Sequence, residues 1–523
     1  MPRDLLLERL LQIQDAQGWI RHRDLAALCA ELRISLAEGF EVATFYHRLE
    51  VVADDAPDPE PVPVRVCDGV PCLLEGAREL AQDITQATGG RVRWGPCIGR
   101  CDVAPAVEVG LHVVAGATVG RVTDALAART VSASEPPAEA LGAYLARGGY
   151  GLLRACLAGE RAVEEVIGAL EIAGLRGLGG AGFPTARKWR AVRSNPAPRY
   201  VVLNADEGEP GTFKDRDCFE RLPHRVFEGL LIACWAVGAD EAYVYLRDEY
   251  AGIRRLLTRE IAALSSAGLS PVRIHLRRGA GAYVCGEESA MLESLEGKRG
   301  YPRHRPPYAA EVGLFGRPTL IQNVETMYWV PEILARGPEW WRSHGRRGRS
   351  GLRLFSLSGR VRRPGAYAAP AGISVAELID EHGGGMAEGH TFAAYLPGGA
   401  AGGILPASLG DLALDFDSLR EHGAGIGSAG VIVLSDHDDV AAVARELMRF
   451  FRDESCGQCT PCRVGTQKAV TLMTGPQWDP TLLGDVAQVM AEASICGLGQ
   501  AAPTPLLSVL RFWPETVGAE RPS

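Results

Sequence analysis

The sequence predicts a multidomain α/β protein that ends in a helical bundle. Its 523 residues exceed what one hydrophobic core usually organises, so we expect several domains. Between residues 145 and 345, strand-like runs such as "YVVLN" and "AYVYL" alternate with helical patterns such as "AGIRRLLTREIAALSSAG". From residue 437 onward the apolar spacing is that of helices, as in "VAAVARELMRFF". These three observations together favour the α/β multidomain class.

The overall composition excludes several classes of protein. Hydrophobic residues make up 46% of the chain and charged residues 23%, as in ordinary globular proteins. The net charge of −9 argues against nucleic acid as a partner. No apolar run is long enough to cross a bilayer, and the charged start lacks a signal-peptide core, so we expect no membrane insertion and a cytoplasmic location. In that compartment the 13 cysteines should be thiols or metal ligands.

Changes of composition along the chain predict five segments. We expect an N-terminal helical segment at 1–55, a small α/β domain at 62–130, a larger α/β domain at 145–345, a domain of short glycine-flanked strands at 350–436, and a helical domain at 437–515. In the small domain, "VRVC" (64–67) and "RVRWGPC" (91–97) indicate strands around a helix over "LLEGARELAQDITQA" (73–87), and "AVEVG" with "HVVAG" indicates a hairpin.

The stretch "GLRGLGGAGFP" (174–184) contains the G-x-G-x-x-G pattern of dinucleotide-binding sites, starting at Gly177. A Rossmann site requires a strand before the glycines and a helix that opens at them. Here the preceding residues 163–170 have helical apolar spacing, and Pro184 does not suit a helix interior, so we reject that fold. Glycines still leave backbone amides open to a phosphate or a flat ring, with Lys188 close by. A flexible surface loop is the alternative.

Two acidic loops strengthen the prediction of a binding site. The loop "NADEGEPGTFKDR" (204–216) follows a predicted strand, and "GAGAYVCGEESAMLESLEGKRGYPRHRPPY" (279–308) begins where another strand ends. Each acidic loop alone is better explained as solvated surface. Together with the glycine stretch they make three loops in one α/β domain, which favour a site built at the ends of the strands.

The C-terminal segment carries a cysteine motif, Cys456-x2-Cys459-x2-Cys462, followed by Cys496. A triple run with a distant fourth cysteine is typical of a [4Fe–4S] cluster. Zinc sites usually pair one C-x-x-C with a second one or with histidines, and zinc is the alternative.

The small domain contains a second set of cysteines, Cys67-x4-Cys72 and Cys97-x3-Cys101, and each pair follows a predicted strand. Thiolate-only ligation with these gaps favours a [2Fe–2S] cluster over zinc. We expect the scattered remaining cysteines to be small buried hydrophobic residues: Cys29, Cys156, Cys218, Cys234 and Cys285.

As a set, these motifs resemble a known family. "GLRGLGGAGFPTARKW", "NADEGEPGTFKDR", "GAYVCGEESAMLESLEGKRG", "PTLIQNVET" and "ESCGQCTPCRVGT" are similar to the NADH-binding flavoprotein subunit of respiratory complex I and its soluble relatives. The first 130 residues, with "ATFYHRLEVV" and four cysteines, resemble the thioredoxin-like [2Fe–2S] subunit that accompanies it. The resemblance implies a thioredoxin-like domain, an α/β FMN- and NAD-binding domain that is not a true Rossmann fold, a β-grasp (ubiquitin-like) SLBB domain and a helical [4Fe–4S] domain.

The fused arrangement is most similar to the β subunit of soluble NAD-dependent formate dehydrogenases of the molybdenum or tungsten type. It implies a diaphorase that receives electrons from a molybdopterin-containing α subunit with further iron–sulfur clusters and passes them as hydride to NAD+. A diaphorase subunit of an NAD-linked hydrogenase or of complex I is the alternative, and a zinc-stapled scaffold without flavin is a third. One departure is Leu178, where the complex I flavoproteins carry arginine.

The resemblance also implies which residues bind the cofactors, while the flavin itself carries the chemistry and no residue is catalytic. FMN would contact Gly177, Gly179, Lys188, Asn204, Asp206, Glu207, Tyr283, Gly286, Glu287, Glu288 and Asn323. NAD(H) would contact Gly180, Phe183, Lys188, Glu209, Glu288 and Tyr308.

Phe183 and Tyr308 would stack on the adenine, whereas the family's third aromatic position is Ala191 here. We expect Glu209 to favour NAD over NADP, because a carboxylate repels the 2′-phosphate.

Overall fold

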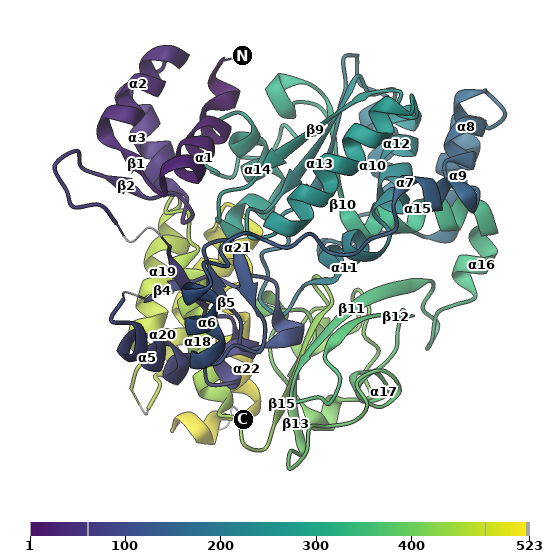
Figure 1. The fold of residues 1–523 in the computed structure, drawn as a ribbon. Coiled ribbons are helices and arrows are strands. Elements are labelled where there is room, and N and C mark those ends of the chain that lie inside the picture. Colours follow the sequence, from purple (N-terminus) through teal and green to yellow (C-terminus); the bar gives the residue numbers. More distant parts are fainter. Residues whose placement is uncertain (1, 60–61, 91, 476, 519–523) are drawn as a thin grey trace.

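The computed structural model describes residues 2–59, 62–90, 92–475 and 477–518. Figure 1 shows the large α/β domain at the top, with the N-terminal helices beside it and the β-grasp domain below it. The small cysteine-bearing domain and the C-terminal helices lie together on the side nearest the N-terminal segment. No helix within the described ranges has both the length and the apolar character needed to span a bilayer.

The N-terminal segment is helical, as predicted. After a 3-10 turn (Pro2–Leu5) it comprises α1 (Leu6–Gln17), α2 (His22–Leu32) and α3 (Leu36–Phe45), with short parallel strands β1 (Ile20–Arg21) and β2 (Val51–Val52). A capping box between Ser35 and Glu38 begins α3. The buried leucines of α1 share one core with Val202 of the large domain, so this segment is packed onto that domain.

The small domain has a four-stranded sheet in the order β4-β3-β5-β6. Its elements are β3 (Val64–Cys67), α4 (Val70–Leu74), α5 (Ala77–Thr88), β4 (Val92–Gly95), β5 (Val107–Val109), β6 (His112–Val114) and α6 (Val119–Ala127). The predicted hairpin is confirmed as antiparallel β5 and β6. The single helix predicted over 73–87 is wrong, because Gly76 adopts φ 79° and separates α4 from α5. Residue 91 of the predicted strand lies outside the described residues.

The large domain has a four-stranded, fully parallel sheet in the order β10-β7-β8-β9. The strands are β7 (Tyr200–Ala205), β8 (Glu241–Leu246), β9 (Arg273–Arg278) and β10 (Thr319–Asn323). The helices are α7 (Leu141–Ala146), α8 (Gly151–Leu157), α9 (Val163–Ala173), α10 (Thr185–Arg193), α11 (Lys214–Arg221), α12 (Pro223–Val237), α13 (Ala251–Ser266), α14 (Glu288–Leu295), α15 (Val324–Arg336) and α16 (Pro338–Arg342). Strands buried on both faces explain the near-continuous apolar runs in the sequence.

The glycine-rich stretch lies between two helices rather than after a strand. Helix α9 ends at Ala173, and α10 begins at Thr185 after Pro184. The Rossmann pattern was therefore correctly rejected, because a helix instead of a strand precedes the glycines and α10 begins only after them. We refer to residues 174–184 as the glycine loop.

The β-grasp domain has a mixed five-stranded sheet in the order β12-β11-β15-β13-β14. Its elements are β11 (Leu352–Gly359), β12 (Gly365–Pro370), α17 (Val375–Glu381), β13 (Phe392–Leu396), β14 (Leu405–Pro406) and β15 (Gly430–Ser435). The helical domain follows with α18 (Val440–Asp453), α19 (Thr460–Leu472), α20 (Pro480–Ala493), α21 (Gly497–Ala501) and α22 (Thr504–Phe512).

Candidate functional site

Two asparagines mark the edge of the parallel sheet where the site lies. In the register of β7 and β10, Asn204 stands opposite Asn323 at the carboxyl ends of the strands. The side chain of Asn204 donates a hydrogen bond to the carbonyl of Gly286 at 2.9 Å, and that of Asn323 donates to Asp215 Oδ2 at 2.6 Å. The loops after β7, β9 and β10 therefore converge at this edge, in agreement with the expectation of a site built at the ends of strands.

A cavity of about 300 Å³ opens at this edge. Nine of the fifteen predicted cofactor residues line it: Gly179, Asn204, Asp206, Glu207, Glu209, Tyr283, Gly286, Glu287 and Asn323. The sequence analysis did not predict the other lining residues: Ala181, Gly208, Thr212, Lys214, Asp215, Val284, Ser428, Gly497 and Leu498. Ser428 comes from the β-grasp domain, and Gly497 and Leu498 come from the helical domain, so the cavity lies where three domains meet.

Two glycines on the cavity wall lie very close to neighbouring segments of the same chain. A Cβ atom at Gly179 would lie 3.0 Å from the Cβ of Asn323, and one at Gly286 would lie 3.2 Å from the carbonyl oxygen of Asp206. Both contacts are tighter than ordinary packing, so side chains at these two positions would crowd the wall. A flat or phosphate-bearing ligand can therefore come close to the main chain here.

Asp206 presents a free acceptor beside the cavity. Its backbone amide donates to Asn204 Oδ1 at 3.0 Å, and its side-chain Oδ2 is buried without a hydrogen-bond partner. Burial raises the pKa of this carboxyl to about 8. A buried acceptor without a donor is costly, so the site fits a ligand with hydroxyl groups, such as the ribityl chain of a flavin.

Glu207 lines the same wall, but its carboxylate is already fully used. Oε1 accepts from the Asp215 amide at 2.8 Å, while Oε2 accepts from the Arg216 amide at 3.1 Å and the Tyr250 hydroxyl at 2.9 Å. The carboxylate thereby satisfies free amides in the first turn of α11. Burial, followed by the charge of Asp215, raises the pKa of Glu207 to about 7.

Lys214 is the charged residue that sequence reasoning missed. Its side chain is 1% exposed and lines the cavity, with Nζ 2.8 Å from Asp215 Oδ1 and 2.9 Å from Glu325 Oε2. Burial opposes the charge, yet the two carboxylates raise the pKa of Lys214 above its ordinary value. The only sequence signal was its place in the "NADEGEPGTFKDR" loop, because its partner Glu325 lies more than a hundred residues away.

Glu209 connects the large domain to the β-grasp domain across the cavity. Its Oε2 accepts from the Tyr283 hydroxyl at 2.7 Å, and its Oε1 accepts from the Ala401 amide at 2.8 Å. Burial raises the pKa of Glu209, while these two hydrogen bonds oppose the shift. Glu287 is also held by its own chain, since it accepts from the amides of Ser289 and Ala290 at the start of α14.

Six of the predicted cofactor residues are not on the wall of this cavity: Gly177, Gly180, Phe183, Lys188, Glu288 and Tyr308. The amide of Gly177 donates to the carbonyl of Phe183 at 2.8 Å and closes the glycine loop on itself. Phe183 and Tyr308 are 47% and 55% exposed, which is unusual for large aromatic side chains.

Lys188 and Glu288 form an ion pair at 3.0 Å, and Arg305 forms a second ion pair with the same carboxylate at 3.4 Å. Burial disfavours the charge, but Lys188 and Arg305 outweigh it and lower the pKa of Glu288. The arrangement places paired charges, rather than a free acid, at these positions.

Three of the four C-terminal cysteines lie at helix starts, and Cys456 lies in the loop between α18 and α19. Cys459 and Cys496 directly precede α19 and α21, and Cys462 lies in the first turn of α19. Burial, followed by the charges of Cys459, Cys496 and Cys456, raises the pKa of Cys462 to about 12. Cysteine thiols lose their protons when a metal cluster binds them, so a set of four cysteine sulfurs fits a cluster of iron and sulfide. Cys496 immediately precedes the cavity residue Gly497.

The N-terminal cysteines form a second buried group. Cys67, Cys72, Cys97 and Cys101 are all buried, and the sulfurs of Cys97 and Cys101 are 3.5 Å apart. A Cβ atom at Gly69 would lie within 3.5 Å of the sulfurs of both Cys67 and Cys97, so the two loops meet there. Among the described residues, no three or more histidine, cysteine, aspartate or glutamate side chains are arranged to coordinate a single metal ion. The five remaining cysteines are buried, as predicted.

Arg247, at the end of β8, joins the second cysteine group to the cavity. Its guanidinium donates to the carbonyl of Cys97 at 2.5 Å and to the carbonyl of Glu207. Arg216 adds a hydrogen bond to the carbonyl of Gly99 at 2.9 Å and an ion pair with Asp102 at 2.7 Å. The cysteine loop 97–102 is thus fixed against the wall of the cavity.

Comparisons with known families and structures agree with this architecture. Four family profiles match: the thioredoxin-like [2Fe-2S] ferredoxin at 1–130, the Nuo51 FMN-binding domain at 170–332, the SLBB domain at 354–404, and the NADH-ubiquinone oxidoreductase-F iron-sulfur binding region at 442–520.

One of the NADH-quinone oxidoreductase F subunits of Rhizobium meliloti is 43% identical over 394 residues, which cover 72% of this chain and 93% of that protein. The corresponding protein of Aquifex aeolicus is 39% identical over 400 residues, which cover 73% of this chain and 92% of that protein. Among solved structures, an NAD+-reducing [NiFe]-hydrogenase in its H2-reduced state has 33% identity and a TM-score of 0.84, covering 97% of this chain and 91% of that one.

The fold and these sites define an NADH-binding oxidoreductase subunit of the diaphorase type, with FMN, a [2Fe–2S] cluster and a [4Fe–4S] cluster. The sequence identity of these relatives, and the share of each chain that the alignments cover, also identify the family. The chain belongs to the NADH-quinone oxidoreductase F subunits, with the [2Fe–2S] domain fused in front of the flavin domain.

Proposed function

We propose that the 300 Å³ cavity holds FMN. The main observation behind this proposal is the unpartnered side-chain oxygen of Asp206. Its unpartnered Oδ2 supplies the acceptor that a ribityl hydroxyl needs, beside the amides of Asn204 and Asn323. Gly179 and Gly286 allow the ring or phosphate to approach the main chain. Lys214 places a buried ammonium group on the wall, where it offsets the charges of Asp215 and Glu325.

When bound, FMN exchanges a hydride with the nicotinamide and single electrons with the iron–sulfur clusters. The protein's part is to orient the nucleotide and to exclude water. The exposed rings of Phe183 and Tyr308 offer apolar faces for the adenine, and the Lys188–Glu288 pair holds a donor and an acceptor for the rest of the nucleotide. Glu209, fixed by Tyr283 and Ala401, keeps a carboxylate where a 2′-phosphate is disfavoured.

The arrangement of the cysteines supports an electron route through the helical domain. Cys496 directly precedes Gly497, the first residue of α21, which lines the cavity. One proposed [4Fe–4S] ligand is therefore adjacent in sequence to the wall of the flavin site. We assign this cluster to Cys456, Cys459, Cys462 and Cys496, and the [2Fe–2S] cluster to Cys67, Cys72, Cys97 and Cys101. Arg247 hydrogen-bonds both to Cys97, a proposed [2Fe–2S] ligand, and to Glu207 on the wall of the flavin cavity, so the proposed [2Fe–2S] site adjoins this cavity.

For the electron donor we propose formate, oxidised on a separate molybdopterin-containing α subunit with further iron–sulfur clusters, in a cytoplasmic complex. The fused arrangement, which resembles the β subunits of such formate dehydrogenases, supports this assignment. Net electron flow would then be towards NAD+.

A hydrogenase is the second candidate donor. The solved NAD+-reducing [NiFe]-hydrogenase covers 97% of this chain, including the fused [2Fe–2S] domain, which favours a protein of the same organisation. The related protein of Rhizobium meliloti instead matches 72% of the chain.

The experiment is NAD+ reduction by the natively purified complex, supplied with formate in one arm and hydrogen in the other. Formate-dependent reduction with molybdenum or tungsten in the preparation supports the proposal. Hydrogen-dependent reduction with nickel establishes the hydrogenase alternative, and NADH oxidation coupled only to quinone establishes a role in complex I.

A further inference from the structure

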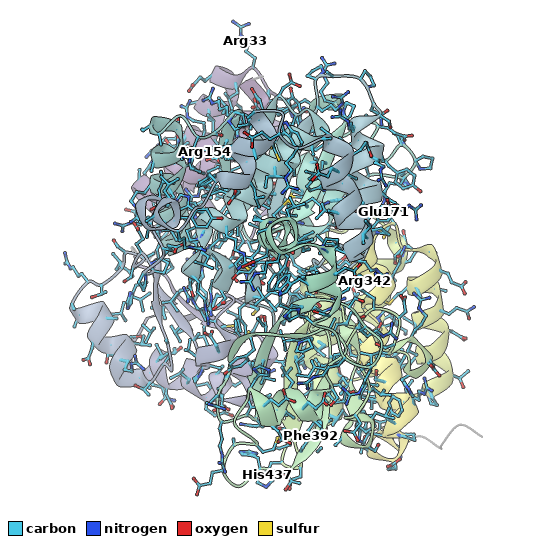
Figure 2. All side chains as sticks on the ribbon, turned by 90° about the vertical axis from the view of Figure 1, so that its right-hand side faces the viewer. Arg33, Arg154, Glu171, Arg342, Phe392 and His437 are labelled. Carbon is cyan, nitrogen blue, oxygen red and sulfur yellow. The ribbon has the colours of Figure 1, made fainter. Side chains whose placement is uncertain are left out.

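A second cavity, of about 460 Å³, lies between the large α/β domain and the β-grasp domain. Its wall combines the end of α9, residues 174–176 and 178 of the glycine loop, the end of α16, residues 348–350, 352 and 353, and the pair Asp415 and Phe416. Helix α16 packs against α9, and Figure 2 shows Arg342 of α16 and Glu171 of α9 on the same side of the molecule. None of the predicted cofactor residues lines this cavity, so it is separate from the flavin site.

The wall of this cavity is rich in arginine. Four arginines line it: Arg176, Arg342, Arg349 and Arg353. Of the residues that the structure describes, Asp415 is the only acidic side chain on this wall. Beyond the wall, Asp417 pairs with Arg176 at 3.1 Å and Glu339 with Arg342 at 3.2 Å. Inside the cavity, positive charge therefore exceeds negative charge, and its surface suits an anion.

Arg353 is the buried member of this set. It is 5% exposed, its guanidinium donates to Asp415 Oδ1 at 2.6 Å, and its Nε has no hydrogen-bond partner. Burial lowers the pKa of Arg353, although the charge of Asp415 opposes this shift. A buried guanidinium with one carboxylate contact is incompletely compensated, and a second anion would complete it.

Two of the arginines are held over one aromatic ring. The guanidinium carbons of Arg353 and Arg176 lie 3.9 Å and 4.2 Å from the centroid of Phe416. Both cations are attracted to the ring, and the charge of Arg176 disfavours that of Arg353. The ring thereby positions two planar donors, and an anion bound to them would offset this repulsion.

We propose that this cavity binds a phosphate-bearing metabolite anion. Planar guanidinium groups bind phosphate oxygens in pairs, and the volume is within the range of small-molecule sites. Trp341, Leu352 and the exposed Ile172 add apolar wall for a non-polar part of the ligand, such as the base of a nucleotide.

The site is placed to influence the flavin cavity. Residues 174–176 and 178 form part of its wall, and Gly179 and Ala181 of the same loop line the flavin cavity. A ligand in the arginine cavity therefore contacts the loop that we place against FMN. The inference about binding does not depend on that coupling, nor on the identity of the electron donor.

The test is equilibrium binding of radiolabelled pyrophosphate and of ADP to the natively purified complex, with saturating NAD+ present to block the nucleotide site. We expect saturable binding of one equivalent per chain. Arg353→Met combined with Asp415→Asn removes the buried pair and leaves no buried unpaired charge, because Arg349, the other neighbour of Asp415, is partly exposed; it should weaken binding about 10-fold or more. Arg349→Gln, on a half-exposed side chain, tests the same wall if the double variant does not fold.

The matched control is Arg161→Gln, which removes one exposed arginine that pairs with Glu165 and does not line the cavity. Unchanged binding in this control, with loss in the cavity variants, establishes the site. Absence of saturable binding, or equal binding in the cavity variants and the control, overturns the proposal. ADP bound without pyrophosphate would assign recognition to the base instead of the phosphates and would also overturn it.

Discussion

The guanidinium of Arg247 donates a 2.5 Å hydrogen bond to the carbonyl of Cys97, one of the four cysteines assigned to the [2Fe–2S] cluster. The same side chain donates to the carbonyl of Glu207, on the wall of the flavin cavity. One buried cation therefore contacts both redox sites. Its pairing with Glu249 at 3.2 Å keeps it in place.

We predict that Arg247→Met lowers the reduction potential of the [2Fe–2S] cluster, because a positive charge beside Cys97 favours the added electron. Redox titration followed by electron paramagnetic resonance measures this shift. Arg247→Lys keeps the charge and should restore most of the potential. Arg121→Gln, an exposed arginine of the same domain, should leave it unchanged. An unaltered potential in Arg247→Met would remove the assigned role.

The free acceptor of Asp206 leads to a prediction about flavin binding. We expect Asp206→Ala to weaken FMN binding by about 3- to 10-fold, the equivalent of one hydrogen bond to a neutral group. The fluorescence of released flavin measures the dissociation constant. Asp217→Ala, which removes an aspartate that pairs with Arg221 outside the cavity, is the control. Equal FMN affinity in the two variants would show that Asp206 does not contact the flavin.

The raised pKa of Asp206 also predicts how the stability of the flavin-free chain depends on pH. An acid whose folded-state pKa is about 8, against about 4 when unfolded, binds its proton more tightly in the folded chain. Its contribution to folding stability therefore declines as the pH rises from about 4 to about 8. Asp206→Asn removes this decline.

We expect the unfolding temperature of flavin-free Asp206→Asn to exceed that of the unchanged chain by about 2–4 °C or more at about pH 8, and by less at about pH 5. Glu454, whose pKa burial also raises to about 8, is present in both proteins and does not affect the comparison. Thermal unfolding monitored by fluorescence measures the difference. An equal difference at both pH values would contradict the assignment.

Glu209 leads to the prediction on nucleotide choice. Glu209→Gln removes the negative charge but keeps an acceptor for Tyr283, so the ratio of kcat/KM for NADPH to that for NADH should rise about 10-fold or more. Tyr283→Phe removes the hydroxyl that holds Glu209 while leaving the charge, and should change the ratio less. Steady-state kinetics with a ferricyanide acceptor gives both values. A ratio unaffected by Glu209→Gln would remove this residue from specificity.

Local sequence patterns predicted much of the fold and part of the site. Asn204 and Asn323 were both expected to contact FMN because of the family resemblance, and the structure places them opposite each other at the ends of β7 and β10. The glycine loop was correctly separated from a Rossmann site because its flanking helix has clear apolar spacing. The helix predicted over 73–87 was wrong because Gly76 alone, at φ 79°, ends one helix before the next begins.

The rest of the site depends on contacts between distant segments. Lys214 is defined by Glu325, and Ser428 and Gly497 reach the flavin cavity from two other domains. No pattern within a short window reports such packing. Arg353 in the arginine cavity is a similar case, since its position in β11 resembles any other strand residue until Asp415 and Phe416 are placed beside it.

Quantitative cofactor analysis of the natively purified chain tests the central claim most directly. The account predicts one FMN, about six irons and about six acid-labile sulfides per chain, with flavin absorbance above a broad iron–sulfur band. Cys459→Ser should reduce the iron to about two per chain while the [2Fe–2S] signal persists. A colourless protein that contains zinc and neither FMN nor iron would contradict the account.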